Sequence, residues 1–439
     1  MTTITQLAEG LRTLFTTVAD DLGRRSGFVE RRSKLTGALF AQALVFGWLA
    51  DPAAALPQLA AAAALAGVSI SPQGLDQRCT SAAAGFLESL LCAAVDVLIQ
   101  ADKVAIPLLA RFTAVELLDS STLVLPDALA DWYPGCGGSS PVHTSAALKL
   151  HVRFDLCRGS LRGPLTSDGR THESTSPLQT APLPQGSLRV ADLGYFCLAV
   201  LAAIAAAGSY FLTRMHHTTA VFTPSGQRTR LLDLLGPAPS YELDVLLGCH
   251  EQLPARLLAV RVPPEVANQR RRRLRREARD KGRTPSAENL AWADWTLLVT
   301  NAGADLLSLP EALVLARARW QIELLFKLWK QYGQIDASRS AKPWRVLCEV
   351  WAKLLAVLIQ HWLALTGCWQ CPQRSLVKAA QVVRTHAMHV LATLGTLDRL
   401  AEALAALHRS LPAACRLNPR KKHPNTSQLL LNPSLLGLA

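Results

Sequence analysis

The 439-residue chain is long enough for two or three domains, and a composition that is half hydrophobic and only 18% charged excludes a disordered protein. Lysine and arginine outnumber aspartate and glutamate by 46 to 33, and the net charge of +13 favours a polyanionic partner, nucleic acid before an anionic membrane. The ten cysteines follow no disulfide-framework spacing and no secretory signal opens the chain, so free cytosolic thiols are expected, with a zinc site at Cys368 and Cys371 as the lesser alternative.

Two apolar stretches, 38–67 and 195–208, invite a membrane-spanning interpretation. The first is broken by Asp51, Pro52 and Pro57, and the second is too short to span a bilayer. We therefore expect both to be buried helices of a soluble protein without a membrane partner.

The pattern of apolar residues over 1–105 is typical of an all-helical domain. An apolar helix is predicted after a basic cluster formed by Arg31, Arg32 and Lys34. Cations gathered before a helix favour contact with DNA phosphates, so these three residues are candidate DNA ligands.

Two further helix starts are predicted in this region, at Ser71-Pro72 and at Thr80-Ser81. Short helices that carry Gln73, Gln77 and Arg78 would suit a helix-turn-helix reader of DNA. A plain helical bundle explains the same segment equally well.

The pattern of apolar residues changes from residue 111 onward. Short apolar or alternating runs predict strands, and an alanine-rich run at 195–207 predicts a helix between the last two of them. The predicted strands are 112–119, 147–156, 161–169, 186–196 and 209–215. Strands followed by a helix and a further strand indicate a mixed α/β sheet.

Residues 216–300 read as a β-rich segment with strands at 241–249, 255–263 and 294–301. Helices are then predicted over 310–332 and 343–365, and the chain ends in a polar, basic piece.

The β-rich segment contains a basic run, "QRRRRLRREARDKGRTPS", at 269–286. Its cations would lie on all sides of a helix and so do not form one salt-bridged stripe. We interpret the run as a phosphate-binding element, with a solvated charged helix as the alternative. It begins with Arg270, Arg271, Arg272 and Arg273.

Two aspartates lie where strands are predicted to end, Asp119 in "ELLDSS" and Asp192 in "VADLGYF". Glu323, on the helix over 310–332, could reach the same sheet edge with its longer side chain. Three converging carboxylates require a cation, and all-oxygen ligands favour two Mg²⁺ or Mn²⁺ ions, which suit phosphodiester chemistry. An aspartate at a strand end is also a common cap or turn former, and rival acids exist at Glu116, Asp127, Asp155 and Asp168.

The helix "RWQIELLFKLWKQYG" places Arg319, Glu323 and Lys330 within a narrow sector of one face, because they are spaced by four and seven residues. A salt-bridged solvent face is the simple explanation for an isolated helix. The rest of the chain decides whether that explanation holds.

The order of these motifs resembles the DDE transposases of bacterial insertion sequences, and the insertion-sequence-four family in particular. That family has the helix pattern Tyr-x2-Arg-x3-Glu-x6-Lys, which Arg319, Glu323 and Lys330 match, whereas Ala316 stands at the Tyr position. The resemblance extends from about residue 30 to about residue 370, and it includes "SPQGLDQR" in the helical part.

The resemblance implies a ribonuclease H-like catalytic core interrupted by a β-rich insertion and preceded by a helical DNA-binding domain. The corresponding boundaries are 1–105 for the helical domain, 106–218 and 303–375 for the two parts of the core, 219–302 for the insertion and 376–439 for a helical C-terminal region with a basic tail.

The resemblance also implies the chemistry. Asp119, Asp192 and Glu323 would bind two Mg²⁺ or Mn²⁺ ions, while Arg319 and Lys330 would contact DNA phosphates. The substrates would be double-stranded terminal inverted repeats and target DNA. A homodimer in the synaptic complex and a bacterial cytoplasmic, nucleoid-associated location follow from the same resemblance.

Some family members cut DNA through a hairpin and stack a flipped base on a tryptophan of the insertion. Trp295 lies in the matching place, with Trp292 as a rival. Packing in a strand core is the alternative role for Trp295.

Three alternative functions share some of these features. A glycosidase also uses paired carboxylates, but the basic charge argues against a neutral sugar substrate. A metal-dependent nuclease with the same core would lack strand transfer. A non-catalytic DNA-binding protein derived from a decayed transposase would have no reason to keep the three acids, although Ala316 in place of Tyr favours it slightly.

Overall fold

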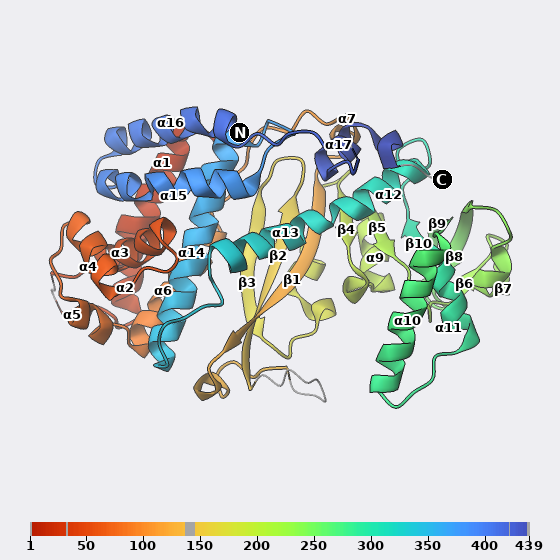
Figure 1. Ribbon diagram of the computed structural model, residues 1–439, viewed down its shortest axis with the longest axis horizontal. Coiled ribbons are helices and arrows are strands. Elements are labelled where there is room, and N and C mark those ends of the chain that lie inside the picture. The colour runs from red at the N-terminus through yellow and green to blue at the C-terminus, as the bar shows by residue number, and fades with distance from the viewer. Residues whose placement is uncertain (1, 32–33, 137–144, 421, 437–439) are drawn as a thin grey trace. The chain divides into compact units, whose positions relative to one another are not determined.

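The computed structural model describes residues 2–31, 34–136, 145–420 and 422–436 (Figure 1). Arg32 of the basic cluster therefore lies outside the described residues. The chain divides into two compact units. Unit 1 comprises Met1–Ile106, Asp119–His172 and Trp320–Ser427, and unit 2 comprises Pro107–Leu118, Glu173–Arg319 and Gln428–Ala439.

The N-terminal part of unit 1 is helical, as predicted. The Ser71 hydroxyl accepts a hydrogen bond from Gly74 N at 3.0 Å, and the Thr80 hydroxyl accepts one from Ala83 N at 3.3 Å, so both predicted helix starts are confirmed. The helices are α1 (Ile4–Thr13), the π-helix η1 (Leu14–Val18), α2 (Ala19–Arg25), α3 (Gly37–Ala50), α4 (Leu56–Leu65), α5 (Pro72–Gln77) and α6 (Ser81–Val95).

The long helix α14 (Pro343–Cys368) forms the centre of unit 1 and packs against α3, α6, α15 (Leu376–Thr393) and α16 (Leu397–Ala414). Among the described residues it is the one helix long and apolar enough to cross a membrane, and its most apolar window is entirely buried. A mainly apolar helix that is buried in this way is a core helix.

The strands form one mixed sheet in the order β3-β2-β1-β4-β5-β10-β9-β8-β6-β7. β1 pairs with β4 and β4 with β5 in parallel, whereas β2–β3, β5–β10 and β8–β9 are antiparallel. The mixed α/β prediction is confirmed. The strands are β1 (Val115–Leu125), β2 (Ala146–Asp155), β3 (Leu161–Asp168), β4 (Leu188–Ala191), β5 (Tyr210–Arg214), β6 (Val221–Phe222), β7 (Arg228–Thr229), β8 (Ser240–Leu247), β9 (Leu253–Arg261) and β10 (Trp295–Thr300).

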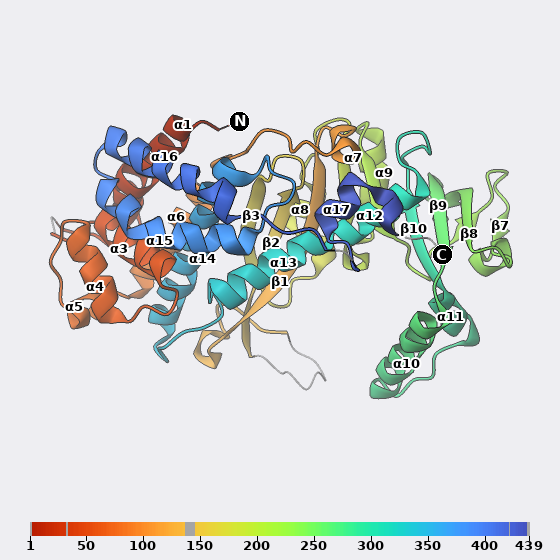
Figure 2. The ribbon, with the colours of Figure 1, turned by 45° about the horizontal axis from the view of Figure 1, so that its top comes forward.

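Strands β8 to β10 in unit 2 share a hydrophobic core with helix α9 (Leu198–Ala206), built from Leu201, Leu257 and Val299 among others. The basic run lies on α10 (Pro264–Asp280), which projects from these strands and leads to α11 (Ala287–Ala291) (Figure 2). Shorter helices of unit 2 are α7 (Pro107–Ala110), α8 (Pro177–Thr180) and the 3-10 turns η4 (Leu193–Tyr195) and η6 (Trp292–Asp294).

The helix predicted over 310–332 is three segments rather than one. They are α12 (Leu309–Ala318), α13 (Trp320–Lys327) and the π-helix η7 (Leu328–Tyr332). Arg319 occupies the turn between the first two, and a π-helix has a wider turn than an α-helix. The ideal spacing of 100° per residue therefore does not hold from Arg319 to Lys330.

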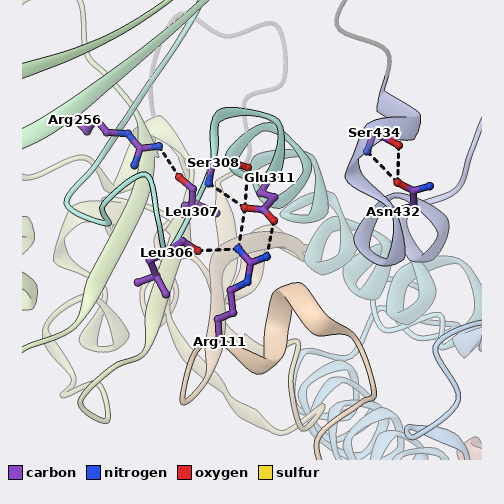
Figure 3. Close-up of polar contacts among 8 residues, drawn as sticks. All are labelled: Arg111, Arg256, Leu306, Leu307, Ser308, Glu311, Asn432 and Ser434. Carbon is purple, nitrogen blue, oxygen red and sulfur yellow. Dashed lines mark hydrogen bonds and ion pairs between the residues drawn. The ribbon is translucent and has the colours of Figure 1, made fainter.

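The start of α12 is anchored by several polar contacts within unit 2 (Figure 3). Arg111 donates two hydrogen bonds to the Glu311 carboxylate at 2.7 and 2.9 Å, and Ser308 completes a capping box with Glu311. Burial raises the pKa of Glu311, but the hydrogen bonds from Arg111 and Ser308 outweigh burial and lower it below its ordinary value. Near the C-terminus of the described chain, Asn432 caps Ser434 at the start of η8 (Pro433–Leu436), which follows α17 (Thr426–Leu431).

Candidate active site and nucleic-acid interface

Two aspartates follow the paired part of adjacent parallel strands. Leu118 of β1 pairs with Ala191 of β4, and the next residue of each strand is Asp119 and Asp192 respectively. In open α/β sheets, ligands bind beyond the carboxyl ends of parallel strands. Both side chains are half-buried, so each remains accessible to a ligand.

Asp192 lies in the loop after β4, and its side chain does not cap the helical turn that follows. Asp192 stands at the N-cap of η4, but within the described chain its carboxylate makes no capping hydrogen bond. The loop is fixed instead by buried Gln179, whose Nε2 donates to Tyr195 O at 2.8 Å. A side chain at position 194 would collide with the Glu173 carboxylate, so Gly194 allows that acid to lie against the loop. Glu173 was not singled out by the sequence patterns.

Asp119 lies in the middle of β1. It is the first residue of the part of this strand that belongs to unit 1. Its Oδ1 accepts a hydrogen bond from Ser120 N at 2.8 Å, and the side chain is half-buried. Asp155 and Asp168 differ, because their carboxylates accept hydrogen bonds from backbone N–H groups two or three residues onward, in the turns that follow β2 and β3. These two rival acids are turn formers.

Glu323 lies in the first turn of α13 and is half-buried. Trp320 and Leu324 flank it on the same helix, and their exposed fractions of 54% and 42% are high for such apolar residues. Sequence periodicity did not single out this exposed pair. Lys330, in η7, donates from Nζ to Thr122 O of β1 at 2.8 Å, which ties this helix to the strand that carries Asp119.

No three acidic, histidine or cysteine side chains are arranged to hold a metal ion within the described part of the chain, and this applies to Cys368 and Cys371 as well. The three acids predicted from the sequence, Asp119, Asp192 and Glu323, would suit Mg²⁺ by their chemistry, because every donor atom would be a carboxylate oxygen.

The arginines of α10 fall into two groups. Arg270 donates to Trp295 O at 2.8 Å and to the Thr296 hydroxyl at 3.1 Å, while Arg271 forms an ion pair with Asp294. Burial lowers the pKa of Arg270, and the nearby charge of Arg214 adds to this effect. These two arginines hold α10 against η6 and β10 rather than presenting their charge to solvent.

The second group is exposed. Arg272, Arg275, Arg276 and Arg279 have the spacing i, i+3, i+4 and i+7, so they share one helical face. Arg273 is also exposed but forms an ion pair with Glu277 at 2.6 Å. The basic run therefore presents one arginine face, which the sequence pattern alone did not distinguish.

Trp295 and Trp292 lie in different environments. Trp295 is 7% exposed, the Arg261 guanidinium covers its ring at 4.5 Å from the centroid, and Tyr241 packs against its edge. Trp292 is half-buried and contacts the His217 ring edge-on, with centroids 6.4 Å apart. The structure thus places Trp295 in the core of unit 2, which is the alternative role considered for it.

Trp292 lines an open cavity of about 740 Å³ in unit 2. His217, Arg228 and Arg230 line the same cavity, together with threonine side chains. Asp233 and Glu288 also line this cavity, so its two arginines are matched by two carboxylates. The sequence patterns did not point to Arg228 or Arg230.

The candidate DNA ligands of the helical region are exposed. Arg31 and Lys34 lie in the connection between α2 and α3, Gln73 lies on α5, and Arg78 is the C-cap of α5. Helix α6, which follows, is largely buried, so α5 and its caps form the accessible part of this region.

Residues 111–359 match the family model described as Transposase DDE domain, which covers more than half of the chain. The chain is 26% identical over 368 residues to the transposase for insertion sequence element IS231B of Bacillus thuringiensis subsp. berliner, covering 77% of this chain and 75% of the relative. It is 23% identical over 373 residues to the transposase for IS1151 of Clostridium perfringens, covering 79% and 77%. A putative transposase InsL for IS186A of Escherichia coli (strain K12) is 30% identical over 237 residues, covering 51% of this chain and 63% of the relative.

The predicted resemblance to DDE transposases of bacterial insertion sequences is confirmed by these matches. The chain belongs to the transposase DDE domain family.

Proposed function

We propose that the protein cuts DNA at the ends of an insertion sequence and joins those ends to target DNA in a metal-dependent reaction. The observation that carries the proposal is the register of β1 with β4, which places an aspartate directly after the last paired residue of each strand. Glu323, on the helix tied to β1 through Lys330, supplies the third acid of the family motif.

The three acids have defined roles in this proposal. Asp119, Asp192 and Glu323 would hold two Mg²⁺ or Mn²⁺ ions, which, when bound, activate a water or a 3′-hydroxyl for in-line attack on a phosphodiester. The chain's own contribution is to orient these carboxylates and to align the DNA backbone. Arg319, half-buried in the turn before α13, is the proposed phosphate contact beside Glu323.

The remaining assignments belong to the same proposal. A ribonuclease H-like core is supported by the strand order β3-β2-β1-β4-β5 with its parallel central pairs. Arg31, Lys34, Gln73 and Arg78 would contact DNA from the helical domain. The protein would act in the bacterial cytoplasm as a homodimer on terminal inverted repeats.

The direct test is incubation of the purified protein with DNA that carries the inverted repeats flanking its gene. We expect strand cleavage and joining to a target plasmid in Mg²⁺, and neither after chelation with EDTA. Cleavage without joining would identify a nuclease with the same core. Sequence-specific binding without cleavage in either Mg²⁺ or Mn²⁺ would identify a DNA-binding protein that has lost catalysis.

The exposed face of α10 leads to a prediction about affinity. Replacement of Arg272, Arg275, Arg276 and Arg279 by glutamine should flatten the slope of log affinity against log salt by about 0.9 for each phosphate contact that is lost. The slope is measured by fluorescence anisotropy on end DNA. Arg273→Gln is the matched control, because its ion pair with Glu277 already uses that charge, and it should change the slope less. An unchanged slope in the fourfold variant would identify α10 as a solvated charged helix.

The two tryptophans lead to a prediction about hairpin formation. If cleavage proceeds through a hairpin, the geometry favours Trp292 over Trp295 as the stacking residue. Trp292→Ala should reduce hairpin formation on a pre-nicked end by about tenfold or more, since stacking contributes roughly 1–3 kcal/mol per base, while first-strand nicking persists.

Trp295→Phe provides the comparison for this assay. It keeps an aromatic ring in the core of unit 2 and should leave hairpin yield unchanged at a lowered melting temperature. Normal hairpin yield with Trp292→Ala would remove Trp292 from the reaction.

A further inference from the structure

Two cysteines of unit 1 that are far apart in the sequence lie beside each other in the structure. Cys79 lies in the turn between α5 and α6, residues 78–80, and Cys348 lies in the second turn of α14. The Cys348 thiol donates a hydrogen bond to the Cys79 sulfur, and its Sγ lies 4.0 Å from the carbonyl oxygen of Thr80. The two thiols are therefore close enough to react with each other.

An ion pair beside the thiols holds the same two segments together. Asp76, in α5, lies three residues before Cys79. Arg345, at the same interval before Cys348 on α14, donates to the Asp76 carboxylate at 2.9 Å. The side chains of Arg345 and Asp76 are only 20% and 17% exposed, so solvent screens this pair little. The end of α5 and the α5–α6 turn are thus held against one face of α14 by a charged pair and a thiol pair.

The surroundings of Cys79 favour the thiolate, which is the form that attacks oxidants. The hydrogen bond from Cys348 is the largest influence and lowers the pKa of Cys79. The positive charge of Arg345 adds to this effect, and together they outweigh burial and the negative charges of Asp76 and Glu349. Cys79 is half-buried, so a small oxidant in solvent can reach its sulfur.

We propose that Cys79 and Cys348 form a site of reversible oxidation, at which a hydroperoxide converts the two thiols to a disulfide that locks the α5–α6 turn onto α14. The locked turn carries Arg78, one of the candidate DNA ligands. This inference is independent of the proposed cleavage reaction.

The oxidation takes place in two balanced steps. The Cys79 thiolate attacks one peroxide oxygen, the O–O bond breaks, and the other oxygen takes up a proton and leaves as an alcohol or water. Cys79 is then a sulfenic acid. The Cys348 sulfur attacks the Cys79 sulfur, and the hydroxyl group leaves with the Cys348 proton as water. The sulfurs lose two electrons in all, and the peroxide accepts them.

Other cysteines of the chain provide internal comparisons. Cys92 is exposed, but desolvation and the charges of Glu88 and Asp96 raise its pKa. Cys368 and Cys415 are also hydrogen-bonded to each other, but they are only 5% and 1% exposed. Exposure alone would make Cys92 the first thiol to be oxidised, whereas proximity alone would make Cys368 and Cys415 as reactive as the proposed pair.

The test treats the reduced, full-length protein with hydrogen peroxide and maps its peptides by mass spectrometry without reductant. We expect a peptide pair linked through Cys79 and Cys348, two hydrogens lighter than the reduced pair, and its release by dithiothreitol. It should form at about a tenth of the peroxide concentration that modifies Cys92. First modification at Cys92, or preferred linkage of Cys368 to Cys415, would overturn the proposal.

Two variants separate the steps. Cys348→Ser keeps a hydrogen-bond donor but cannot form the disulfide, so dimedone should trap Cys79 as a sulfenic acid in this variant and much less in the unsubstituted protein. Cys92→Ser is the matched control and should leave the disulfide unchanged. Equal trapping of Cys79 with and without Cys348 would show that Cys348 does not react with the sulfenic acid, and the proposal would fail.

Hydrogen exchange measures the lock itself. Peptides covering 72–80 should exchange more slowly after oxidation, and neither Cys348→Ser nor the protein reduced again by dithiothreitol should show this protection. Equal exchange before and after oxidation would overturn the lock. These measurements use no DNA, so their outcome does not depend on whether the protein cuts DNA.

Discussion

Asp119→Asn, Asp192→Asn and Glu323→Gln should each abolish Mg²⁺-dependent cleavage of end DNA. Each change keeps the size of the side chain but replaces a carboxylate by an amide, which is a weaker ligand for a hard cation. Loss of one ligand in a two-ion site should reduce the rate by roughly a thousandfold or more, which corresponds to about 4 kcal/mol of transition-state stabilisation. The measurement is single-turnover strand cleavage of a labelled transposon end.

DNA binding by these variants should persist, since removing a negative charge does not disturb the basic surfaces. Asp127→Asn and Asp168→Asn are the controls, because Asp127 is exposed in a 3-10 turn and Asp168 caps the turn after β3. Both should cleave at close to the normal rate. Retained cleavage by Asp119→Asn, Asp192→Asn or Glu323→Gln would remove that residue from the site, and loss of cleavage in Asp168→Asn with normal stability would make Asp168 a rival ligand.

The strands and most helices could be predicted because their signals are local. Alternating or apolar runs that end in turn residues gave β1 to β5 and β8 to β10, and Ser71 and Thr80 marked helix starts by capping. The end of the predicted strand at Asp119 was wrong, since β1 continues to Leu125. The polar residues 120–122 resemble a turn, but they extend the strand as a half-buried segment.

The roles of single side chains in the insertion could not be predicted in the same way. Arg270 and Arg271 cannot be distinguished from Arg272 in sequence, and only the packing of α10 on η6 and β10 partly buries the first two. Trp295 and Trp292 are likewise separated by which ring enters the core, and that depends on partners such as Arg261, far away in the sequence. Tertiary contacts decide these cases, whereas periodicity does not.

The division of the helix over 309–332 was missed for a related reason. Its apolar residues keep a helical pattern across Arg319 and into η7, so periodicity predicts one helix. The π-turn is stabilised by contacts from elsewhere in unit 1, namely Lys330 with Thr122 and Lys353 with Gln334. The motif spacing was therefore sufficient to identify Arg319, Glu323 and Lys330, but it could not predict the direction of the Lys330 side chain.

Lys353→Met should be the most destabilising substitution among those considered. Lys353 is 2% exposed, forms an ion pair with Glu349 at 2.7 Å, and caps the carbonyls of Gln334 and Ala337. Methionine fills the space but leaves the Glu349 carboxylate buried with one hydrogen bond, from Ser338. Breaking a buried pair from one side typically destabilises a protein by about 3–5 kcal/mol.

The measurement is unfolding in urea, monitored by hydrogen exchange of peptides from 333–353. This local readout is needed because a chain with two units need not unfold in one step. Lys342→Met is the matched control, because Lys342 forms an ion pair of the same 2.7 Å length with Asp76 but its side chain is 71% exposed. An exposed pair contributes about 0–1 kcal/mol, so this control should unfold almost normally. The double variant Lys353→Met/Glu349→Leu should regain part of the lost stability, because it no longer buries an unpaired carboxylate. If Lys353→Met proved no less stable than Lys342→Met, the network around Lys353 would not hold the end of η7, and the fixed backbone beside Lys330 would lose its main support.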